Sequence, residues 1–203
     1  VQQAGMLGVI ETVPTYRALM VHLDPLTADH NRLFDALLQL ARRALPQSGV
    51  RRRWTVPVVY GDAHGQDLKA LAQHHGMTSK EIAELHLSAV YRVYMVGFMP
   101  GFTYLGGLDA RLHTPRRSEP RSYIPGGSIS IGGAQTAIGA APSPSGWHLI
   151  GRTPVRCFVA ARKPAFLFEA GDEVVFQAEP AGRWETLKAA SAAGELIANC
   201  EVF

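Results

Sequence analysis

Three arginines in the segment TPRRSEPRSYIPGGS are well suited to bind an anion: Arg116, Arg117 and Arg121. Arg152 stands further along the chain, in GWHLIGRTP. A guanidinium presents a planar fork of N–H donors that matches the oxygens of a carboxylate or a phosphate. The same side chains could instead tie loops together by donating to backbone carbonyls, and their spacing favours neither role.

Aromatic and polar residues in the same part of the chain could complete a binding cleft. Small-molecule sites are usually apolar clefts that contain a few well-placed polar groups. Gln135 and Thr136 lie between glycine turns in PGGSISIGGAQTAIGAAPSPSGW. We therefore predict a substrate site, although the sequence assigns no catalytic residue. The candidate substrate-binding residues are Phe98, Phe102, Tyr104, Arg116, Arg121, Gln135, Thr136, Trp147 and Arg152.

Standard motifs of nucleotide binding and catalysis do not occur in the sequence. A P-loop needs a lysine after its second glycine, but Gly107 stands in that place after Gly101 and Gly106. The glycine-rich stretch from 125 to 147 has no lysine, so we interpret its glycines as turns and close-packed strands. Neither G-x-S-x-G nor HExxH is present. No metal site is predicted.

The histidines could serve as metal ligands or as structural groups. His74 and His75 are neighbours on a predicted helix, where side chains point about 100° apart, so they make a poor chelate. We expect this pair at the surface. His86 is expected to be a structural histidine with hydrogen-bonded ring nitrogens, and a place at the domain junction is the alternative.

The first part of the chain combines strands and helices. LGVIETV and YRALMVHLD alternate as two antiparallel strands, and apolar residues between 29 and 45 follow the spacing of an amphipathic helix that Pro46 and Gly49 end. RRRWTVPVVY predicts a further strand. A helix is expected over 65–75, and the capping box that begins at Thr78 opens another.

From Ala89 onward, short β-rich runs alternate with Gly and Pro turns. They are YRVYMVGF, SYIPGGSISI, TAIGAA, HLIGRT, VRCFVA and EVVFQAE, with no long amphipathic helix among them. Such a pattern is typical of a barrel or sandwich of short strands. We therefore predict a small α+β domain over residues 1–88 and a mainly β domain over residues 89–203.

Composition limits the class of protein. The chain has 203 residues, 47% of them hydrophobic, and a formal net charge of +3, as in globular proteins. The run Arg51-Arg52-Arg53 has no interleaved aromatic residues, so no nucleic-acid partner is expected. No stretch reaches the roughly 18 apolar residues of a membrane span. Cys157 and Cys200 lack CxxC spacing; Cys157 is expected to be buried, and a cytoplasmic location is expected.

Several long blocks of the sequence resemble one family. They are YRVYMVGFMPGFTYLGGLD, TPRRSEPRSYIPGGSISIGGAQT and PSPSGWHLIGRTP, together with GVIETVPTYRALMVHLDP near the start. On these motifs the chain resembles the KipI/PxpB family of 5-oxoprolinase subunits. Its members also carry the name allophanate hydrolase subunit 1, and urea carboxylases contain the same carboxyltransferase module. The resemblance implies an α+β N-terminal domain followed by a cyclophilin-like β-barrel.

The resemblance also implies an activity and partners. A KipA/PxpC-type subunit, and in many bacteria a LamB/YcsF-type third subunit, would act with this chain as an ATP-dependent 5-oxoprolinase that opens 5-oxoproline to glutamate. The complex would use ATP, and no ATP site is located in this chain. Phosphorylation of the lactam oxygen would activate an unstrained cyclic amide, and nearby arginines could stabilise the phosphate charge. The alternatives are a KipI-like histidine-kinase inhibitor and a subunit related to allophanate hydrolase or urea carboxylase.

Two departures from the family pattern affect these expectations. Gly139 stands in TAIGAAP where members commonly carry an aromatic residue, and the usual Pro-Gly-Gly-Trp is here Pro144-Ser145-Gly146-Trp147. The substrate therefore stays open between 5-oxoproline and a urea-like amide. Members also begin with a strand and a helix ahead of the position of Leu7, so the N-terminal domain is expected to lack both.

Overall fold

The computed structural model describes residues 4–43 and 51–203 and divides the chain into two compact units, Val1–Val50 and Arg51–Phe203. In the first unit, β1 (Val9–Pro14) and β2 (Leu19–Leu23) form an antiparallel hairpin, as predicted, and α1 (His30–Arg43) follows. Asp29 accepts the backbone N–H groups of Asn31 and Arg32 at 3.1 Å, which satisfies donors at the start of α1. The predicted stop signals Pro46 and Gly49 lie outside the described residues.

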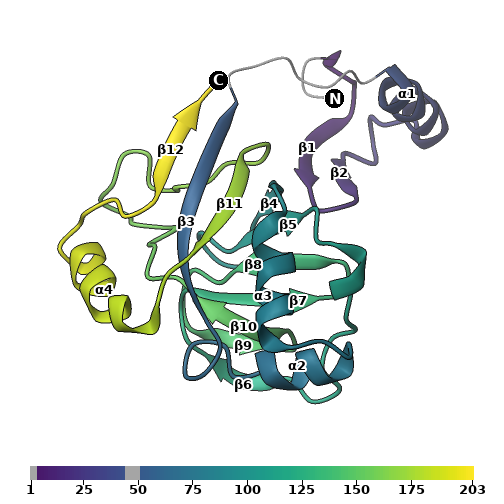
Figure 1. Cartoon of the computed structure of the whole chain (residues 1–203). Coiled ribbons are helices and arrows are strands. Elements are labelled where there is room, and N and C mark those ends of the chain that lie inside the picture. The colour runs from purple at the N-terminus through teal and green to yellow at the C-terminus, as the bar shows by residue number, and fades with distance from the viewer. Residues whose placement is uncertain (1–3, 44–50) are drawn as a thin grey trace. The chain divides into compact units, whose positions relative to one another are not determined.

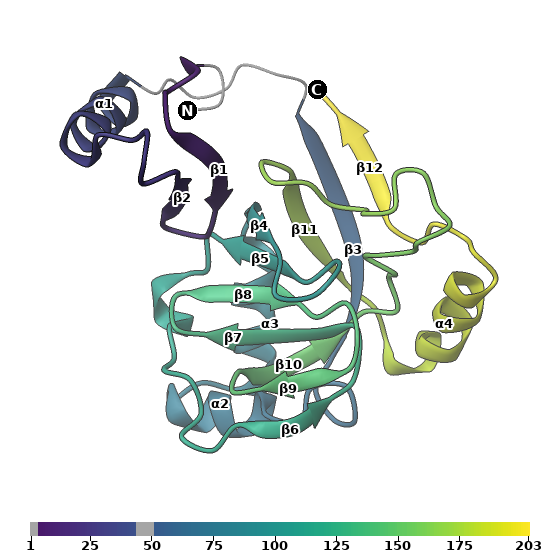
Figure 2. The same ribbon diagram turned by 180° about the vertical axis from the view of Figure 1, so that it is seen from behind.

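The second unit is a closed β-barrel of seven strands (Figures 1 and 2). Around the ring the order is β10, β7, β8, β5, β4, β11 and β3, and β3 pairs again with β10. Closure removes the free edges that an open sheet would expose. The strands are β3 (Arg52–Tyr60), β4 (Tyr91–Val96), β5 (Thr103–Gly106), β7 (Ser128–Gly132), β8 (Gln135–Ile138), β10 (His148–Arg152) and β11 (Glu173–Ala178).

Strand β3 closes the barrel because it pairs with strands on both of its edges, three strands in all. One edge of β3 pairs in parallel with β11. The other edge pairs antiparallel with two strands: the first half of β3 pairs with β12 (Asn199–Val202), and the end of β3 pairs with Gly151 and Arg152 of β10. The division between 50 and 51 therefore differs from the boundary predicted near residue 88. Sequence pattern identified β3 as a strand, but its partners lie roughly 90 to 150 residues away, and no local signal reveals them.

Two helices after β3 also belong to the barrel unit rather than to the N-terminal unit. They are α2 (Leu68–His74) and α3 (Ser79–Ser88), and they lie side by side against the barrel in both views (Figures 1 and 2). Leu68, Leu71 and Ile82 face the hydrophobic core. The predicted capping box is present, since the Thr78 hydroxyl accepts the Glu81 N–H while the Glu81 carboxylate accepts the Thr78 N–H.

The C-terminal half differs from the sequence prediction in two places. A helix, α4 (Trp184–Ala192), follows β11 where only strands were expected, because its nine residues are too few for a long periodic pattern. The run VRCFVA is mostly irregular and contributes only an isolated bridge between Phe158 and Phe166. Cys157 within it is buried, as predicted, and burial raises the pKa of its thiol to about 12.

A second, small sheet supports the loops at one end of the barrel. It pairs β6 (Arg121–Ile124) with β9 (Ser143–Ser145) in antiparallel fashion. The short helical turns are η2 (Ala110–Leu112) and η3 (Ala181–Arg183). Within the described parts of the chain, no helix has the length and apolar character needed to cross a membrane.

Candidate substrate-binding cavity

Five of the nine predicted site residues line one cavity of about 240 Å³. Phe98 and Phe102 come from the loop between β4 and β5, and Tyr104 comes from β5. Arg116 comes from the loop before β6, and Trp147 directly precedes β10. The barrel thus brings together residues from three separate segments of the sequence, around 98–104, 116 and 147.

The walls of this cavity are aromatic. Phe102 lies 4.7 Å from Tyr104 between ring centroids, and Trp147 lies edge-on to Tyr104 at 6.0 Å. A Cβ at Gly132 would lie 2.5 Å from the Trp147 indole, so only glycine lets this ring lie flat against β7. The resulting surface is suited to a flat, largely apolar ring.

Phe98 carries backbone strain at the mouth of the cavity. Its φ is +71°, in the left-handed region that a bulky L-residue rarely adopts. The side chain is 66% exposed and packs edge-on against Phe102 at 5.6 Å. Strain of this kind concentrates at binding and catalytic sites, so Phe98 is a candidate for contact with a ligand.

Arg116 supplies positive charge beside the aromatic wall. Its guanidinium carbon lies 5.6 Å from the centroid of Trp147. Within residues 4–43 and 51–203, no hydrogen bond or ion pair engages this guanidinium, which is therefore available to an anion. Partial burial raises the pKa of the neighbouring Tyr104 phenol, and the charge of Arg116 opposes that rise, so Tyr104 stays a neutral hydrogen-bonding group at pH 7.

Arg121 does not line this cavity but serves a structural role. It donates two hydrogen bonds to the buried carboxylate of Asp67, at 2.6 and 2.8 Å. Asp67 also accepts the Leu149 N–H at 2.8 Å, and Arg117 approaches it at 3.4 Å. Asp67 was not among the predicted residues. Its place directly before the helical pattern of α2 was the available signal, because aspartate is typical of helix N-termini.

Thr136 faces the barrel interior rather than the aromatic cavity. Its hydroxyl donates to the Ser130 carbonyl at 3.1 Å and therefore accepts the Nε2 proton of His86 at 2.9 Å. The other His86 nitrogen, Nδ1, then accepts from the Tyr60 hydroxyl at 2.7 Å. His86 is fully buried and satisfied, as the structural interpretation predicted. Burial lowers its pKa to about 3.

The remaining predicted residues, Gln135 and Arg152, are not among those that line the aromatic cavity. Gln135 is half-buried on the face of β8 that also carries Ala137, which packs on Phe102 and Trp147. Arg152 lines a different cavity beside α4. A Cβ at Gly139 would make only ordinary contacts, the closest at 3.5 Å to the Ser128 carbonyl, so the backbone there does not require glycine.

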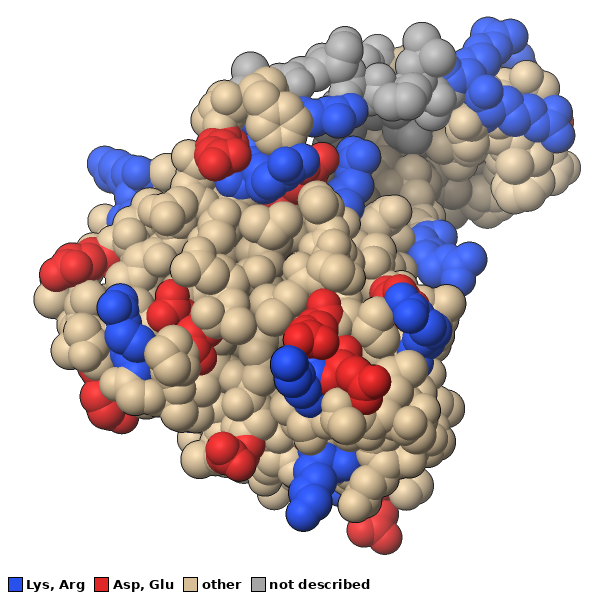
Figure 3. All heavy atoms as spheres, viewed as in Figure 1, with Lys and Arg blue, Asp and Glu red and all other residues tan. Residues whose placement is uncertain are grey.

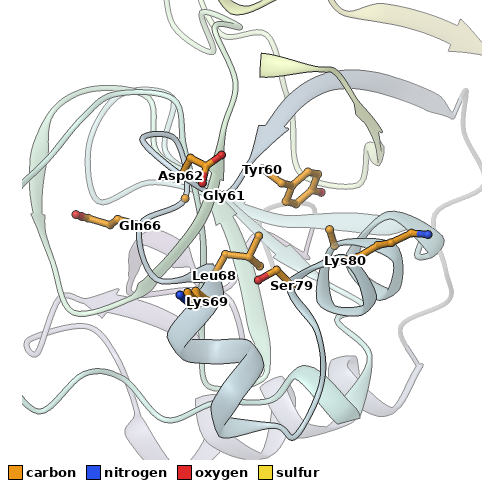
Figure 4. Close-up of a pocket in the computed structure, with 10 residues that line it drawn as sticks. Tyr60, Gly61, Asp62, Gln66, Leu68, Lys69, Ser79 and Lys80 are labelled. Atoms are coloured by element: carbon orange, nitrogen blue, oxygen red, sulfur yellow. The ribbon is translucent and has the colours of Figure 1, made fainter. Parts of the chain in front are cut away.

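The face of the barrel unit seen in Figure 3 carries no cluster of charge of one sign. On the face seen in Figure 3, basic and acidic side chains of this unit are interspersed. A further cavity of about 500 Å³ lies between the loop after β3 and the start of α3 (Figure 4). Lys69 and Lys80 line it together with Asp62. It contains none of the nine predicted residues, and its mixed charges favour no single class of ligand.

A match to a protein-family model assigns the class of this chain. Residues 1–168 match the carboxyltransferase domain, subdomain C and D, so the chain belongs to that family. A solved structure with the same fold is the K. lactis urea amidolyase, with a TM-score of 0.82 over all of this chain and 14% of that one. At 17% identity this likeness concerns the fold alone.

Within this class, curated relatives place the chain in the KipI/PxpB family that the motifs indicated. It is 42% identical to a 5-oxoprolinase subunit of Escherichia coli O157:H7, over 87% of this chain and 81% of that protein. The protein of the same name from Bacillus subtilis (strain 168) is 35% identical over 87% of this chain and 78% of its own length. A conserved uncharacterized protein from Pyrococcus horikoshii has a TM-score of 0.63 and 35% identity, covering 90% of this chain and 84% of that one.

Proposed function

We propose that this chain is a subunit of an ATP-dependent 5-oxoprolinase that hydrolyses 5-oxoproline to glutamate. It would act in the cytoplasm with a KipA/PxpC-type subunit and a LamB/YcsF-type subunit. The observation that carries the proposal is the 35% to 42% identity to proteins named as one particular subunit of 5-oxoprolinase, over most of their length.

The aromatic cavity suits the chemistry of this substrate. 5-Oxoproline is a small lactam ring that carries one carboxylate. The Arg116 guanidinium has no hydrogen-bond or ion-pair partner among the described residues and matches that carboxylate. The rings of Phe102, Tyr104 and Trp147 offer faces to the lactam. Binding here would fix the orientation of the lactam carbonyl before ATP-dependent activation by the complex.

The decisive experiment is reconstitution of the complex. We expect ATP hydrolysis by the three purified subunits to depend on 5-oxoproline, to yield glutamate, and to stop when this chain is omitted. Allophanate and urea serve as competing substrates in parallel reactions. ATP hydrolysis that does not depend on 5-oxoproline but does depend on allophanate or urea would overturn the proposal. The chain would then be a subunit related to allophanate hydrolase or urea carboxylase.

A binding measurement tests the regulatory alternative. If the complex shows no 5-oxoproline-dependent turnover, while the chain binds and inhibits a histidine kinase, the KipI-like function replaces the enzymatic one. Catalytic turnover together with an absence of kinase binding supports the proposal as stated.

A further inference from the structure

A cavity beside α4 in the barrel unit is lined by three basic side chains. Its volume is about 440 Å³, and it lies between β10 and α4, the helix at the side of the barrel away from α2 and α3 (Figures 1 and 2). Arg152, Arg156 and Lys188 line it. Among the residues that the structure describes, no aspartate or glutamate lines this cavity.

Arg152 is the most unusual of these three cations. Its Nη2 donates to the Gly126 carbonyl at 3.0 Å, whereas its Nε is buried and has no hydrogen-bond partner in the described structure. The guanidinium carbon lies 4.8 Å from the centroid of Trp184, which holds the side chain in place. Burial lowers the pKa of Arg152, the direction expected for a cation that lacks a counter-charge.

Two other half-buried arginines of the same unit, unlike Arg152, form hydrogen bonds with a carboxylate. Arg52 forms two hydrogen bonds of 2.8 Å with Asp172, and Arg121 forms an equivalent pair with Asp67. Removing a guanidinium from water is unfavourable unless an anion compensates for the loss. For Arg52 and Arg121 the chain supplies that anion. For Arg152 the described residues supply the Gly126 carbonyl, the Trp184 ring and the nearby Tyr123 phenol, but no carboxylate.

We propose that this cavity is a binding site for the phosphate group of a small molecule, held by Arg152, Arg156 and Lys188. Three cations line the cavity, and among the described residues one of them, Lys188, forms an ion pair with a carboxylate, that of Glu185 at 3.3 Å. The excess of two positive charges matches a phosphate dianion better than a single carboxylate. The proposal does not rest on the proposed function, because it involves none of the aromatic-cavity residues.

Calorimetric titration of the full chain with inorganic phosphate at low ionic strength tests the site. We expect saturable binding, weakened at least tenfold in Arg152→Gln and about threefold in Lys188→Ala, since the latter removes an exposed charge. Lys69→Ala is the matched control, because it removes an exposed lysine from another cavity and should leave binding unchanged. Lys188→Ala keeps the test interpretable if loss of the Arg152 contact with Trp184 impairs folding.

Parallel titrations identify the source of the phosphate. Tighter binding of ATP, displaced by inorganic phosphate, would assign the site to a nucleotide, whereas tighter binding of inorganic phosphate would assign it to the free ion; either result supports the proposal. Acetate binding as tightly as phosphate would overturn it. So would an absence of phosphate binding by the native chain, or equal binding by the native chain and both cavity variants.

Discussion

Arg116 and Arg121 lie in the same short segment, but their guanidinium groups contact different kinds of side chain. Arg121 closes on the buried carboxylate of Asp67 through two short hydrogen bonds. Arg116 lies against Trp147 at the edge of an aromatic cavity, with no carboxylate partner among the described residues. A guanidinium neutralised by a buried acid stabilises the fold, whereas one that lies on an aromatic ring keeps its N–H donors for a ligand.

The barrel interior resembles the Asp67 cluster rather than the cavity. Tyr60, His86 and Thr136 satisfy one another completely, and the chain of hydrogen bonds ends on the Ser130 carbonyl. Buried polar networks of this kind define a unique packing when every member is satisfied. Mutations in the Asp67 cluster or the barrel interior should therefore lower the stability of the chain, whereas mutations in the aromatic cavity should lower activity.

The largest expected effect is on the stability of the Asp67 cluster. Asp67→Ala should lower the free energy of unfolding by about 3 to 5 kcal/mol, because it leaves the half-buried Arg121 and the Leu149 N–H without their acceptor. Urea denaturation measures this loss. Asp109→Ala is the control, since it breaks an exposed ion pair with Arg111 and should cost far less. Similar losses in the two variants would contradict the structural role.

Replacing Arg116 should lower activity rather than stability. Arg116→Ala is expected to lower 5-oxoproline-dependent turnover of the complex by about 10- to 100-fold, since a charge-assisted hydrogen bond contributes about 1.5 to 3 kcal/mol. Its free energy of unfolding should change by less than about 0.5 kcal/mol. Arg111→Ala, an exposed arginine that lines none of the described cavities, should keep full turnover. A destabilised Arg116 variant with normal turnover would remove the distinction between the two arginines.

The buried His86 predicts a pH dependence of stability. Because its pKa falls to about 3 in the folded chain, the unfolded chain binds a proton that the folded chain does not between pH 6.5 and 3. Stability should therefore decrease by about 1.4 kcal/mol for each pH unit below 6.5. Urea denaturation from pH 7 to 4 should show a shallower dependence in His86→Phe. Parallel curves for the native chain and the variant would exclude His86 as the cause.

Phe98 should show the smallest effect on turnover. Phe98→Gly should be more stable than Phe98→Ala by about 1 kcal/mol, because glycine adopts the positive φ without strain. Both variants should lose turnover by a few-fold, since both remove the ring at the mouth of the cavity. Thermal unfolding of the two variants measures the effect of backbone strain, and their turnover measures the effect of losing the ring. Equal stability of the two would mean that the backbone there is unstrained.

Much of the local structure could be predicted from the sequence. Alternating residues identified β1 and β2, β-rich runs identified β3 and β11, and the capping box placed the start of α3 at Thr78. These signals succeed because they depend on neighbours two to four residues apart. The short helix α4 and the irregular run around Cys157 gave no periodic pattern of sufficient length.

The candidate site was predicted only in part. Five of the predicted residues, Phe98, Phe102, Tyr104, Arg116 and Trp147, line one cavity, and their role in substrate binding stays a prediction. The same prediction placed Thr136 beside them, although its side chain points into the barrel, because the face of a short strand depends on its register with strands far away in the sequence.

By itself, the sequence determined the family, most of the strands and helices, and the residue types available for binding. Only the tertiary structure decided that β3 belongs to the barrel, which arginines are neutralised and which remain free. The physical reason is that local pattern reflects contacts within a few residues. The role of a guanidinium depends instead on the carboxylate or ring that barrel closure brings to it, as Asp67 is brought to Arg121 and Trp147 to Arg116.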